Sequence, residues 1–436
     1  MSYLIYFAIA GFTYLIILSV LWSISFILLS RFIKNLYLLV IISLIPSIIL
    51  ILYVGSVLEN LILSGADTTM LLPFIVIYLC VFALILKSTL FKKLPGPIIK
   101  QVLPENTKYW NLETGSNVAY WFYAAKEKKK DYPIVYVHGG PGAHVRNIDR
   151  DYFKSFSNEG YDVYLYDQSG GGFSDYLNVT EYSMDRFIDD LECIRKNINA
   201  DQMILVGQSF GARICSHYAA TYEKRVESII YAGPAGLQST TLRQDIKNSK
   251  ELENSEIEFA SSAIDKFKPS FQEIIRFSFT VLMCKLGGEI IVDQIISQKE
   301  ITEYATRMIP EAIGRAYHKK FAHLVPTITS GGINVIVNVL MHNNYNKISS
   351  DMINKLSTSD IPVLILRSAY DYVPWTDTRY YKDVFKNHYL VYISDSGHVA
   401  WSVNKNDTMN SMINFINGNT NKLICYNDDK NPLFER

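Results

Sequence analysis

Long uncharged stretches dominate the beginning of the chain. No charged side chain occurs from Met1 to Ser30, and two further uncharged stretches run from about Leu36 to Leu58 and from Met70 to Leu86. A helix that crosses the hydrocarbon core of a bilayer needs ~20 apolar residues. The pattern therefore predicts a membrane region over residues 1–88, with three transmembrane helices at about 3–30, 36–58 and 70–86 and a lipid bilayer as their partner.

The basic residues around these stretches predict their orientation, because Lys and Arg are enriched on the cytoplasmic side of a membrane. Arg31 and Lys34 lie between the first two stretches, and Lys87 follows the third. Glu59 and Asp67, without Lys or Arg, lie between the second and the third. We therefore expect a multi-pass protein with the N-terminus outside and the long remainder of the chain in the cytoplasm. No ionisable residue lies inside the stretches, which favours an anchor over a transporter.

After a linker at residues 89–106, short apolar runs alternate with helix-length segments, which is typical of an α/β sheet protein. A hairpin is expected over Tyr109 to Ala124. The other predicted strands are Pro133–Val137, Asp162–Tyr166, Gln202–Val206, Val226–Ala232, Val363–Leu366 and Tyr389–Ile393. Most are continuously apolar, as in a mostly parallel sheet flanked by helices. The alternation is lost over residues 236–356, which predicts a helical cap inserted between two parts of the core, 107–235 and 357–436.

Composition agrees with a membrane part joined to a globular part, since 49% of the residues are hydrophobic and 19% are charged. Lys+Arg and Asp+Glu both number 42, so no net positive charge favours nucleic acid as a partner. The chain has 5 cysteines, and this small and odd number argues against a disulfide framework. Neither a CxxC nor an HExxH motif occurs, so no metal site is expected.

The first indication of catalytic chemistry is a predicted strand that ends in Gly-x-Ser-x-Gly. Gly207-Gln208-Ser209-Phe210-Gly211 follows the apolar run Met203 to Val206 and precedes a helix-like segment. Glycines permit the tight turn that exposes a serine hydroxyl, and the helix N-terminus behind it can stabilise an oxyanion. This setting predicts Ser209 as a nucleophile.

A serine nucleophile needs a base, and the base needs an orienting acid. Asp371 follows the predicted strand Val363–Leu366, and His398 follows the last predicted strand. The order Ser, Asp, His along the chain is that of α/β-hydrolases. Three further carboxylates compete for the role of the acid, namely Asp377, Asp383 and Asp395.

Two glycine-rich turns lie upstream. His138-Gly139-Gly140-Pro141-Gly142 ends a strand and is expected to donate the Gly140 N–H, together with that of Phe210, to an oxyanion. His138 is expected to orient this turn rather than to transfer protons. The turn at 167–174 lacks the Gly-Lys-Ser/Thr ending of a phosphate-binding loop and is expected to pack beside the active site.

Together these motifs resemble one family. His-Gly-Gly-Pro-Gly at 138–142, Asp-Gln-Ser-Gly-Gly-Gly-Phe-Ser at 167–174 and Gly-Gln-Ser-Phe-Gly at 207–211, with Asp371 and His398, look like the proline iminopeptidase branch of the α/β-hydrolases. The resemblance covers roughly residues 108–418. It implies an α/β-hydrolase fold with a helical cap, a triad of Ser209, Asp371 and His398, and no cofactor.

The resemblance also implies a reaction on small peptides. We expect aminopeptidase activity that releases an N-terminal residue such as proline through an acyl-enzyme. The branch usually has Arg where Ser169 stands, and its peptidases hold the substrate's amino group with cap glutamates that no motif identifies here. A hydrolase of esters, thioesters or lipids is therefore one alternative, and a non-catalytic membrane interaction protein that retains the fold is another.

Overall fold

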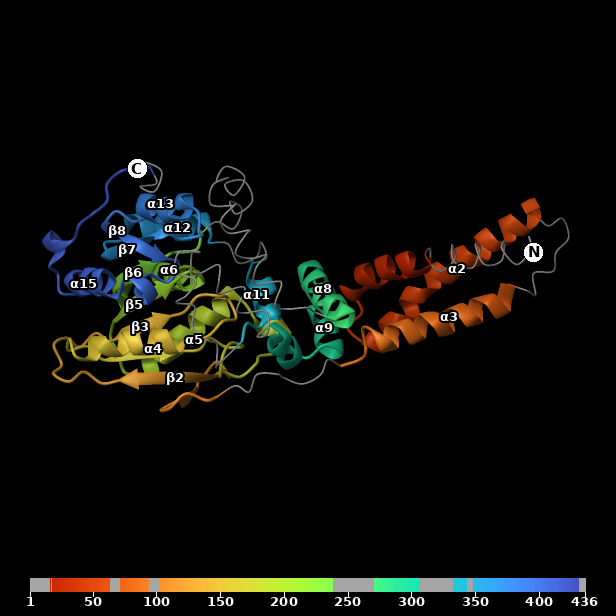
Figure 1. The fold of residues 1–436 in the computed structure, drawn as a ribbon, viewed down its shortest axis with the longest axis horizontal. Coiled ribbons are helices and arrows are strands. Elements are labelled where there is room, and N and C mark those ends of the chain that lie inside the picture. The colour runs from red at the N-terminus through yellow and green to blue at the C-terminus, as the bar shows by residue number, and fades with distance from the viewer. Residues whose placement is uncertain are drawn as a thin grey trace. The chain divides into compact units, whose positions relative to one another are not determined.

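The computed structural model describes residues 16, 18–62, 71–93, 102–237, 270–305, 332–342 and 348–430 of the 436-residue chain. It divides into two compact units. One comprises residues 1–96 and 269–300, and the other comprises residues 97–268 and 301–436. Figure 1 gives the labels of the elements in both units.

The larger unit is built on a single eight-stranded sheet with the order β1-β2-β4-β3-β5-β6-β7-β8. Its strands are β1 Lys108–Asn111, β2 Asn117–Tyr123, β3 Ile134–Val137, β4 Val163–Tyr166, β5 Met203–Gln208, β6 Val226–Ala232, β7 Val363–Tyr370 and β8 His388–Gly397. The pairs β1–β2 and β2–β4 are antiparallel, and the pairs from β4 to β8 are parallel. The carboxyl ends of the parallel strands therefore meet at one edge of the sheet.

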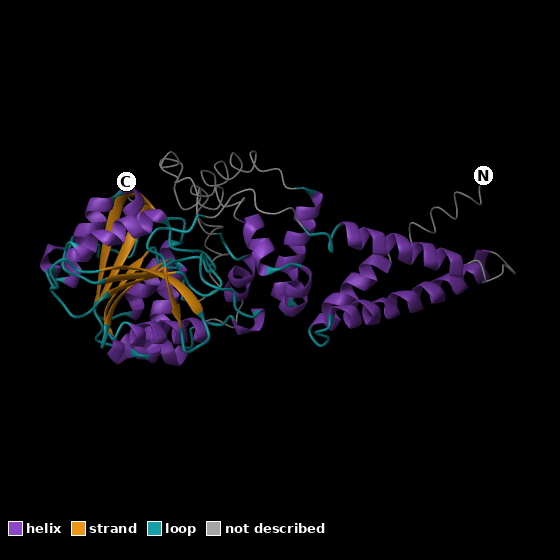
Figure 2. Cartoon of the chain, turned by 90° about the horizontal axis from the view of Figure 1, so that it is seen from below, coloured by secondary structure: helices purple, strands orange, loops and turns teal. Residues whose placement is uncertain are grey.

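Helices cover both faces of this sheet (Figure 2). The helices are α4 Asn147–Lys154, α5 Met184–Asn197, α6 Phe210–Thr221, α11 Val335–His342, α12 Ser350–Thr358, α13 Trp375–Val384, α14 Ala400–Val403 and α15 Lys405–Ile416, with the short 3-10 helices Ser155–Ser157, Val179–Glu181, Glu223–Arg225 and Thr420–Lys422. These elements bury the central strands from both sides.

Alternate residues of each central strand face the two cores, because side chains of a strand point to opposite faces in turn. Leu205 and Ile365 pack with residues of α5, α6, α12 and α13 in one core. Their neighbours Val206 and Leu366 pack with residues of α4, α14 and α15 in the other. Since both faces are apolar, the strands appear in the sequence as continuous apolar runs, and the predicted hairpin and all six further strands are found.

The smaller unit contains α2 Leu36–Ile62 and α3 Leu71–Ser88 together with α8 Phe271–Leu286 and α9 Glu289–Ile295. Residues 18–30 are also helical. The ring of Trp22 contacts Phe26 and Phe82, and that of Phe26 contacts Phe279 of α8. Segments far apart in the sequence thus share one apolar core.

Polar groups join α8 and α9 to the N-terminal segments within this unit. The side chain of Arg276 is fully buried, donates to the carbonyls of Leu90 and Ile295, and pairs with Glu300 at 2.6 Å. Gln294 accepts from the N–H of Leu36 at 3.0 Å. Residues 269–300, which were expected to belong to a cap, therefore belong to the unit that contains the N-terminal helices.

The structure also bears on the predicted membrane region. Helices occupy the second and third predicted ranges, and residues 3–15 and 17 of the first range lie outside the described residues. Within the described part of the chain, no helix has the length and the apolar character that crossing a membrane requires. The prediction of three transmembrane helices at 3–30, 36–58 and 70–86 is therefore not supported.

Candidate active site

Ser209 stands on a tight turn between β5 and α6. Its backbone has φ 53° and ψ −119°, a region that side-chain-bearing residues rarely adopt. The Ser209 N–H donates to the carbonyl of Ala232 at the end of β6, and its carbonyl accepts from Ala212 and Ala235. These three hydrogen bonds fix the conformation of the turn. They hold Ser209 at the edge of the sheet where the parallel strands have their carboxyl ends.

The turn leaves no space for side chains at its flanks. A Cβ at Gly207 would lie 2.7 Å from the Cα of Ala212, and one at Gly211 would lie 2.0 Å from the carbonyl oxygen of Val137. Both glycines of the Gly-x-Ser-x-Gly motif are therefore required by close backbone contacts, as the sequence predicts.

Asp371 and His398 lie at the ends of the adjacent strands β7 and β8. His398 Nδ1 is 2.7 Å from Asp371 Oδ1, and both side chains are almost completely buried. Asp371 Oδ1 also accepts from the Val373 N–H at 2.9 Å. The carboxylate thus fixes the imidazole with Nδ1 facing Asp371 and Nε2 facing the other way.

The charge of the Asp371 carboxylate is stabilised by its surroundings. Burial alone would raise the pKa of Asp371, but the charge and hydrogen bond of His398 oppose it. The buried Arg367 guanidinium, whose Nη1 is 3.9 Å from Oδ2, adds to this effect. The net result is a pKa of Asp371 below its ordinary value, so the carboxylate is ionised at neutral pH.

The competing acids lie elsewhere. Asp383 is half exposed and pairs with Arg379 at 3.6 Å. Asp377 is buried on α13, where its carboxylate lies close to Gly236. Asp395 lies within β8, three residues before His398. Among the described residues, the acid that contacts His398 is Asp371.

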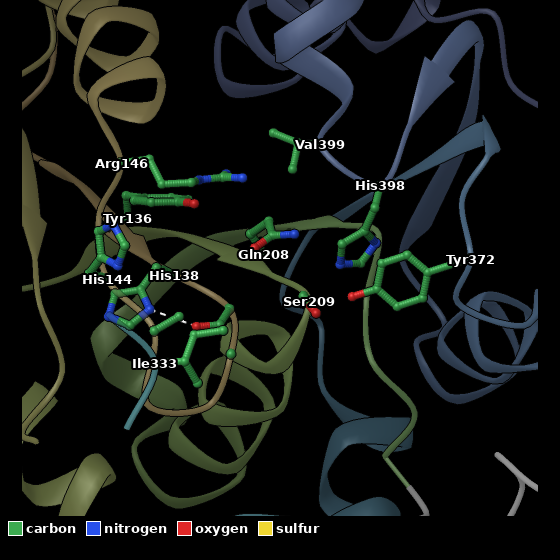
Figure 3. A pocket seen from close by; sticks show the side chains of 13 residues that line it. Tyr136, His138, His144, Arg146, Gln208, Ser209, Ile333, Tyr372, His398 and Val399 are labelled. Atoms are coloured by element: carbon green, nitrogen blue, oxygen red, sulfur yellow. Dashed lines mark hydrogen bonds between the residues drawn. The ribbon is translucent and has the colours of Figure 1, made fainter. Parts of the chain in front are cut away.

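Ser209 and His398 line the same cavity of about 200 Å³. Figure 3 shows both side chains at one end of it, with Tyr372 beside them. His398 Nε2 is buried, and no hydrogen-bond partner for it occurs among the described residues. An imidazole nitrogen without a partner beside a serine hydroxyl is an arrangement in which a proton can move between the two when a substrate is bound.

The first glycine-rich turn forms the wall of the cavity next to Ser209. Gly139 and Gly140 both line it, and a Cβ at Gly139 would lie 2.8 Å from that of Ser209. Gly140 has φ 135°, which glycine adopts without strain. The turn therefore passes directly against the serine, where backbone N–H groups can reach an oxyanion.

Phe210 is the first residue of α6, so its N–H is one of those that have no carbonyl partner within the helix. Its ring is buried and contacts Arg213 and His342. The side chain thus packs below the turn, while the backbone N–H belongs to the helix N-terminus next to Ser209.

His138 is held as a neutral ring. Its Nε2 accepts from the N–H of Gln168 at 3.0 Å, and its Nδ1 lies 2.7 Å from the carbonyl oxygen of Gly139. Burial lowers the pKa of His138 to about 4. These contacts tie the turns at 138–142 and 167–174 together.

Helix α11 and the residue before it, Asn334, contact the turn at 138–142, although they lie almost 200 residues away in the sequence. Asn334 donates its N–H to the Gly142 carbonyl at 2.8 Å and its side-chain amide to the Gly170 carbonyl. Asn338 Nδ2 donates to the Pro141 carbonyl at 3.1 Å. The backbone of both glycine-rich turns is thereby anchored to residues of the insertion.

Sequence reasoning missed several residues of the site. Tyr372 packs its ring on His398 with 4.3 Å between centroids. Gly233, with φ 52°, lies where a Cβ would be 2.6 Å from Asp371 Oδ2 and 3.0 Å from His398 Nδ1. Arg146 lines the cavity. No sequence motif identifies these three residues. Tyr372 simply follows Asp371, and Gly233 and Arg146 lie in loops that have no characteristic spacing.

The described part of the chain contains no cluster of three or more His, Cys, Asp or Glu side chains able to hold a metal ion.

Comparisons with known proteins agree with this architecture. The alpha/beta hydrolase fold family matches residues 132–404, which is more than half of the chain. A proline iminopeptidase of Heyndrickxia coagulans is 33% identical over 141 residues, covering 32% of this chain and 47% of the relative. One of Saccharolobus solfataricus is 28% identical over 182 residues, covering 39% and 56%. The chain thus spans about half the length of the curated relatives it matches.

Solved structures are matched at low sequence identity. The crystal structure of VinJ has a TM-score of 0.48 and 15% identity, covering 72% of this chain and 99% of that one. A proline iminopeptidase of Mycobacterium smegmatis has a TM-score of 0.44 and 13% identity, covering 72% and 98%. The family match covers more than half of the chain, and the chain therefore belongs to the alpha/beta hydrolase fold family.

Proposed function

We propose that the chain is a serine hydrolase that works through a triad of Ser209, His398 and Asp371. The observation that carries the proposal is the Asp371–His398 pair at 2.7 Å, with His398 Nε2 directed away from the carboxylate in the cavity that Ser209 lines. The tautomer that Asp371 stabilises has its proton on Nδ1 and leaves Nε2 as a base.

In the first half-reaction, Ser209 Oγ attacks the substrate carbonyl while His398 Nε2 accepts the hydroxyl proton. Asp371, whose pKa is held below its ordinary value, stabilises the imidazolium. The N–H groups of Gly140 and Phe210 donate to the oxyanion of the tetrahedral intermediate. His398 then gives the proton to the leaving group, and an ester between Ser209 and the acyl group remains.

In the second half-reaction, water attacks the acyl-enzyme, and His398 accepts one of its protons. The second tetrahedral intermediate collapses to release the acid, and the proton returns from His398 to Ser209 Oγ. The cycle needs no cofactor. Removal of one oxyanion donor in a hydrolase of this kind costs ~3 kcal/mol of transition-state stabilisation.

For the substrate, we propose short peptides from which an N-terminal residue such as proline is released. Support comes from the matched relatives that bear the name proline iminopeptidase, at 26 to 33% identity. The motifs of the two glycine-rich turns and the serine turn lie within residues 132–404, which the alpha/beta hydrolase fold family matches.

A second candidate is the hydrolysis of small esters or thioesters. It is favoured by the lining of the cavity, which among the described residues includes Ile333, Val399 and the rings of Tyr136 and Tyr372, but no carboxylate to hold a substrate ammonium group. A peptidase that recognises a free amino group needs such a carboxylate.

One experiment tests the mechanism. The purified full chain is treated with a fluorophosphonate probe, beside the variant Ser209→Ala. We expect labelling of the wild type and none of the variant, with both giving the same circular dichroism spectrum. Labelling that survives the substitution would assign the nucleophile to another residue.

A second experiment separates the two substrate classes. Release of proline from proline amides is compared with hydrolysis of short-chain and long-chain p-nitrophenyl esters. Activity on the esters without activity on the amides would exclude the peptidase. The predicted location, with the N-terminus outside and the hydrolase unit in the cytoplasm, stays a prediction that digestion by protease added to intact cells can test.

A further inference from the structure

The side chain of Gln208 projects into the cavity beside Ser209. Gln208 is the last residue of β5 and directly precedes the serine, and it lines the cavity although only 5% of its surface is exposed. Figure 3 shows its side chain between the ring of Tyr136 on one side and that of His398 on the other. Gln208 belongs neither to the proposed triad nor to the proposed oxyanion donors, so its amide is a polar group that the mechanism leaves unused.

Within the described residues, no group forms a hydrogen bond with the side-chain amide of Gln208. The amide of Gln168 is also buried, but it donates to the His138 carbonyl at 2.7 Å. Burial of an amide removes its hydrogen bonds to water, and a partner is needed to replace them. For an amide that lines a cavity, a polar group of a bound ligand can be that partner.

The two ends of the Gln208 amide face different surroundings. A Cβ at Gly139 would lie 2.5 Å from Gln208 Oε1, so this oxygen lies against the first glycine-rich turn. Figure 3 shows the amide nitrogen on the side that faces His398. The N–H groups are therefore the part of the amide that a substrate at Ser209 meets, and such donors require an acceptor oxygen.

The charges in the cavity wall favour a neutral acceptor. The guanidinium of Arg146 is paired with the buried Asp149 carboxylate at 2.6 Å. Burial lowers the pKa of His138 to about 4 and that of His144 to about 3, so both rings are neutral at pH 7. Among the described lining residues, no unpaired permanent charge is thus left to compensate an anionic oxygen, and a neutral carbonyl oxygen fits the site better.

The size of the cavity and the position of Gln208 limit where this oxygen lies in the substrate. About 200 Å³ of space accommodates a short acyl group with few further atoms. Gln208 and Ser209 are consecutive and line the same cavity, so the amide lies close to the substrate atoms around the reacting carbonyl. The acceptor therefore lies within a few bonds of that carbonyl.

We propose that Gln208 is a substrate-binding residue whose amide donates a hydrogen bond to a neutral carbonyl oxygen of the substrate, a few bonds from the carbonyl that Ser209 attacks. The inference rests on the proposed hydrolase function and names its substrate class, namely short acyl compounds with such a second carbonyl. The next carbonyl of a short peptide and an oxo group in the acyl chain of an ester share this chemistry.

The test uses two matched pairs of substrates with the full chain, and the members of each pair differ only in the second carbonyl. One pair is p-nitrophenyl 4-oxopentanoate and p-nitrophenyl pentanoate, and the other is the acetonylamide and the propylamide of proline. The preference is the ratio of kcat/KM for the member with the second carbonyl to kcat/KM for the member without it.

We expect the wild-type preference in at least one pair to exceed the ratio of the alkaline hydrolysis rates of the same two compounds. The excess should be about 5- to 10-fold, the size expected for one hydrogen bond between neutral groups. Comparison with alkaline hydrolysis removes the difference in intrinsic reactivity between the members. The pair that shows the excess identifies the source of the carbonyl, as a peptide or as an acyl chain.

The variant Gln208→Met keeps the length of the side chain without its donors, and it should lower the preference by the same factor, whatever its effect on the absolute rates. Gln208→Asn keeps the N–H donors on a shorter side chain and should retain more of the preference than Gln208→Met. The matched control is Gln202→Met, because Gln202 directly precedes β5 at its other end and donates to the Lys224 carbonyl. This control should retain the wild-type preference.

Two results would overturn the inference, namely a wild-type preference no larger than the ratio of the alkaline rates in both pairs, or equal preferences in the wild type and Gln208→Met. The first result needs no variant, so a folding defect in Gln208→Met does not remove the test. Fluorophosphonate labelling separates both results from a failure of the proposed function, since unlabelled Ser209 would remove the function itself. If the probe labels Ser209 but none of the four compounds is hydrolysed, their protection against labelling gives the same comparison within each pair.

Discussion

The Asp371 carboxylate occupies space that is available because Gly233 has no side chain. A Cβ at position 233 would lie 2.6 Å from Asp371 Oδ2 and 3.0 Å from His398 Nδ1. Gly233 follows β6 directly and has φ 52°, and its N–H donates to the Leu366 carbonyl of β7 at 3.1 Å. The residue that follows β6 thus helps to position the Asp371–His398 pair, although it has no side chain.

The variant Gly233→Ala should separate the carboxylate from the imidazole. We expect kcat/KM to fall about 100-fold, because a displacement of about 1 Å in a catalytic group has effects of this size. The matched control is Gly418→Ala, where φ is 75° and no atom lies within 4 Å of the added Cβ. Both variants carry the backbone strain of about 1–2 kcal/mol, so equal activities in the two would contradict the prediction.

Asp371→Asn should abolish most of the activity while the fold is retained. An asparagine amide at this position favours the wrong tautomer of His398, and in serine proteases the corresponding change lowers kcat about 10⁴-fold. Initial rates on the best ester or amide measure the effect. Asp383→Asn, at the exposed acid paired with Arg379, should leave the rate unchanged. A larger loss of activity in Asp383→Asn than in Asp371→Asn would contradict the assignment of Asp371 as the acid.

Asn338→Ala should weaken the anchor of the turn at 138–142. Asn338 Nδ2 donates to the Pro141 carbonyl, next to Gly140, so its loss permits the turn to move. We expect kcat to fall about 5-fold with KM changed less than twofold, since one hydrogen bond contributes ~1 kcal/mol. The exposed Asn410 of α15 provides the control variant Asn410→Ala. A change in KM alone would indicate that Asn338 contacts the substrate instead.

His138 should make the protein less stable in acid. Its pKa is about 4 in the folded state, lowered by burial from the ordinary 6.5, so the unfolded chain binds more protons between these values. Stability that is fully present above pH 6.5 is therefore lost as the pH falls toward 4, by at most about 3 kcal/mol. Urea unfolding at pH 7 and pH 5 measures the difference.

The variant His138→Gln isolates this contribution, because it removes the titrating group. Its stability should depend less on pH than that of the wild type over the same range. Comparison of the two proteins also separates His138 from Asp167, whose pKa is raised by burial to about 7 and which acts in the opposite direction. Identical pH dependences in the two proteins would contradict the prediction.

The sheet could be predicted from the sequence because its strands are buried on both faces. Runs such as Val363–Leu366 are apolar at each position, and the two cores take alternate residues from them. Ser209, Asp371 and His398 could be proposed as a group for a related reason. Each directly follows a strand of the parallel part of the sheet, whose carboxyl ends meet at one edge.

Other features depend on contacts that leave no pattern in the sequence. Asn334, which lies in the insertion, donates its N–H to the Gly142 carbonyl. Tertiary packing rather than local structure brings these two residues together, so no pattern along the sequence predicts the contact. Arg146 lies in a loop after a glycine-rich turn, where an arginine is usually solvated. The association of α8 with the N-terminal helices depends on the buried side chain of Arg276. In the sequence, Arg276 is a single charged residue in an amphipathic segment, and this pattern predicts only that it lies on a solvent-exposed face.

The backbone conformation of Ser209 has a consequence for how the sequence can evolve. A residue with a side chain at φ 53° and ψ −119° costs about 1–3 kcal/mol relative to a relaxed backbone. A glycine at position 209 would avoid this cost and should raise the melting temperature, but it would lack the hydroxyl that the proposed mechanism requires. Under that mechanism, selection for thermal stability and selection for activity therefore favour different residues at position 209.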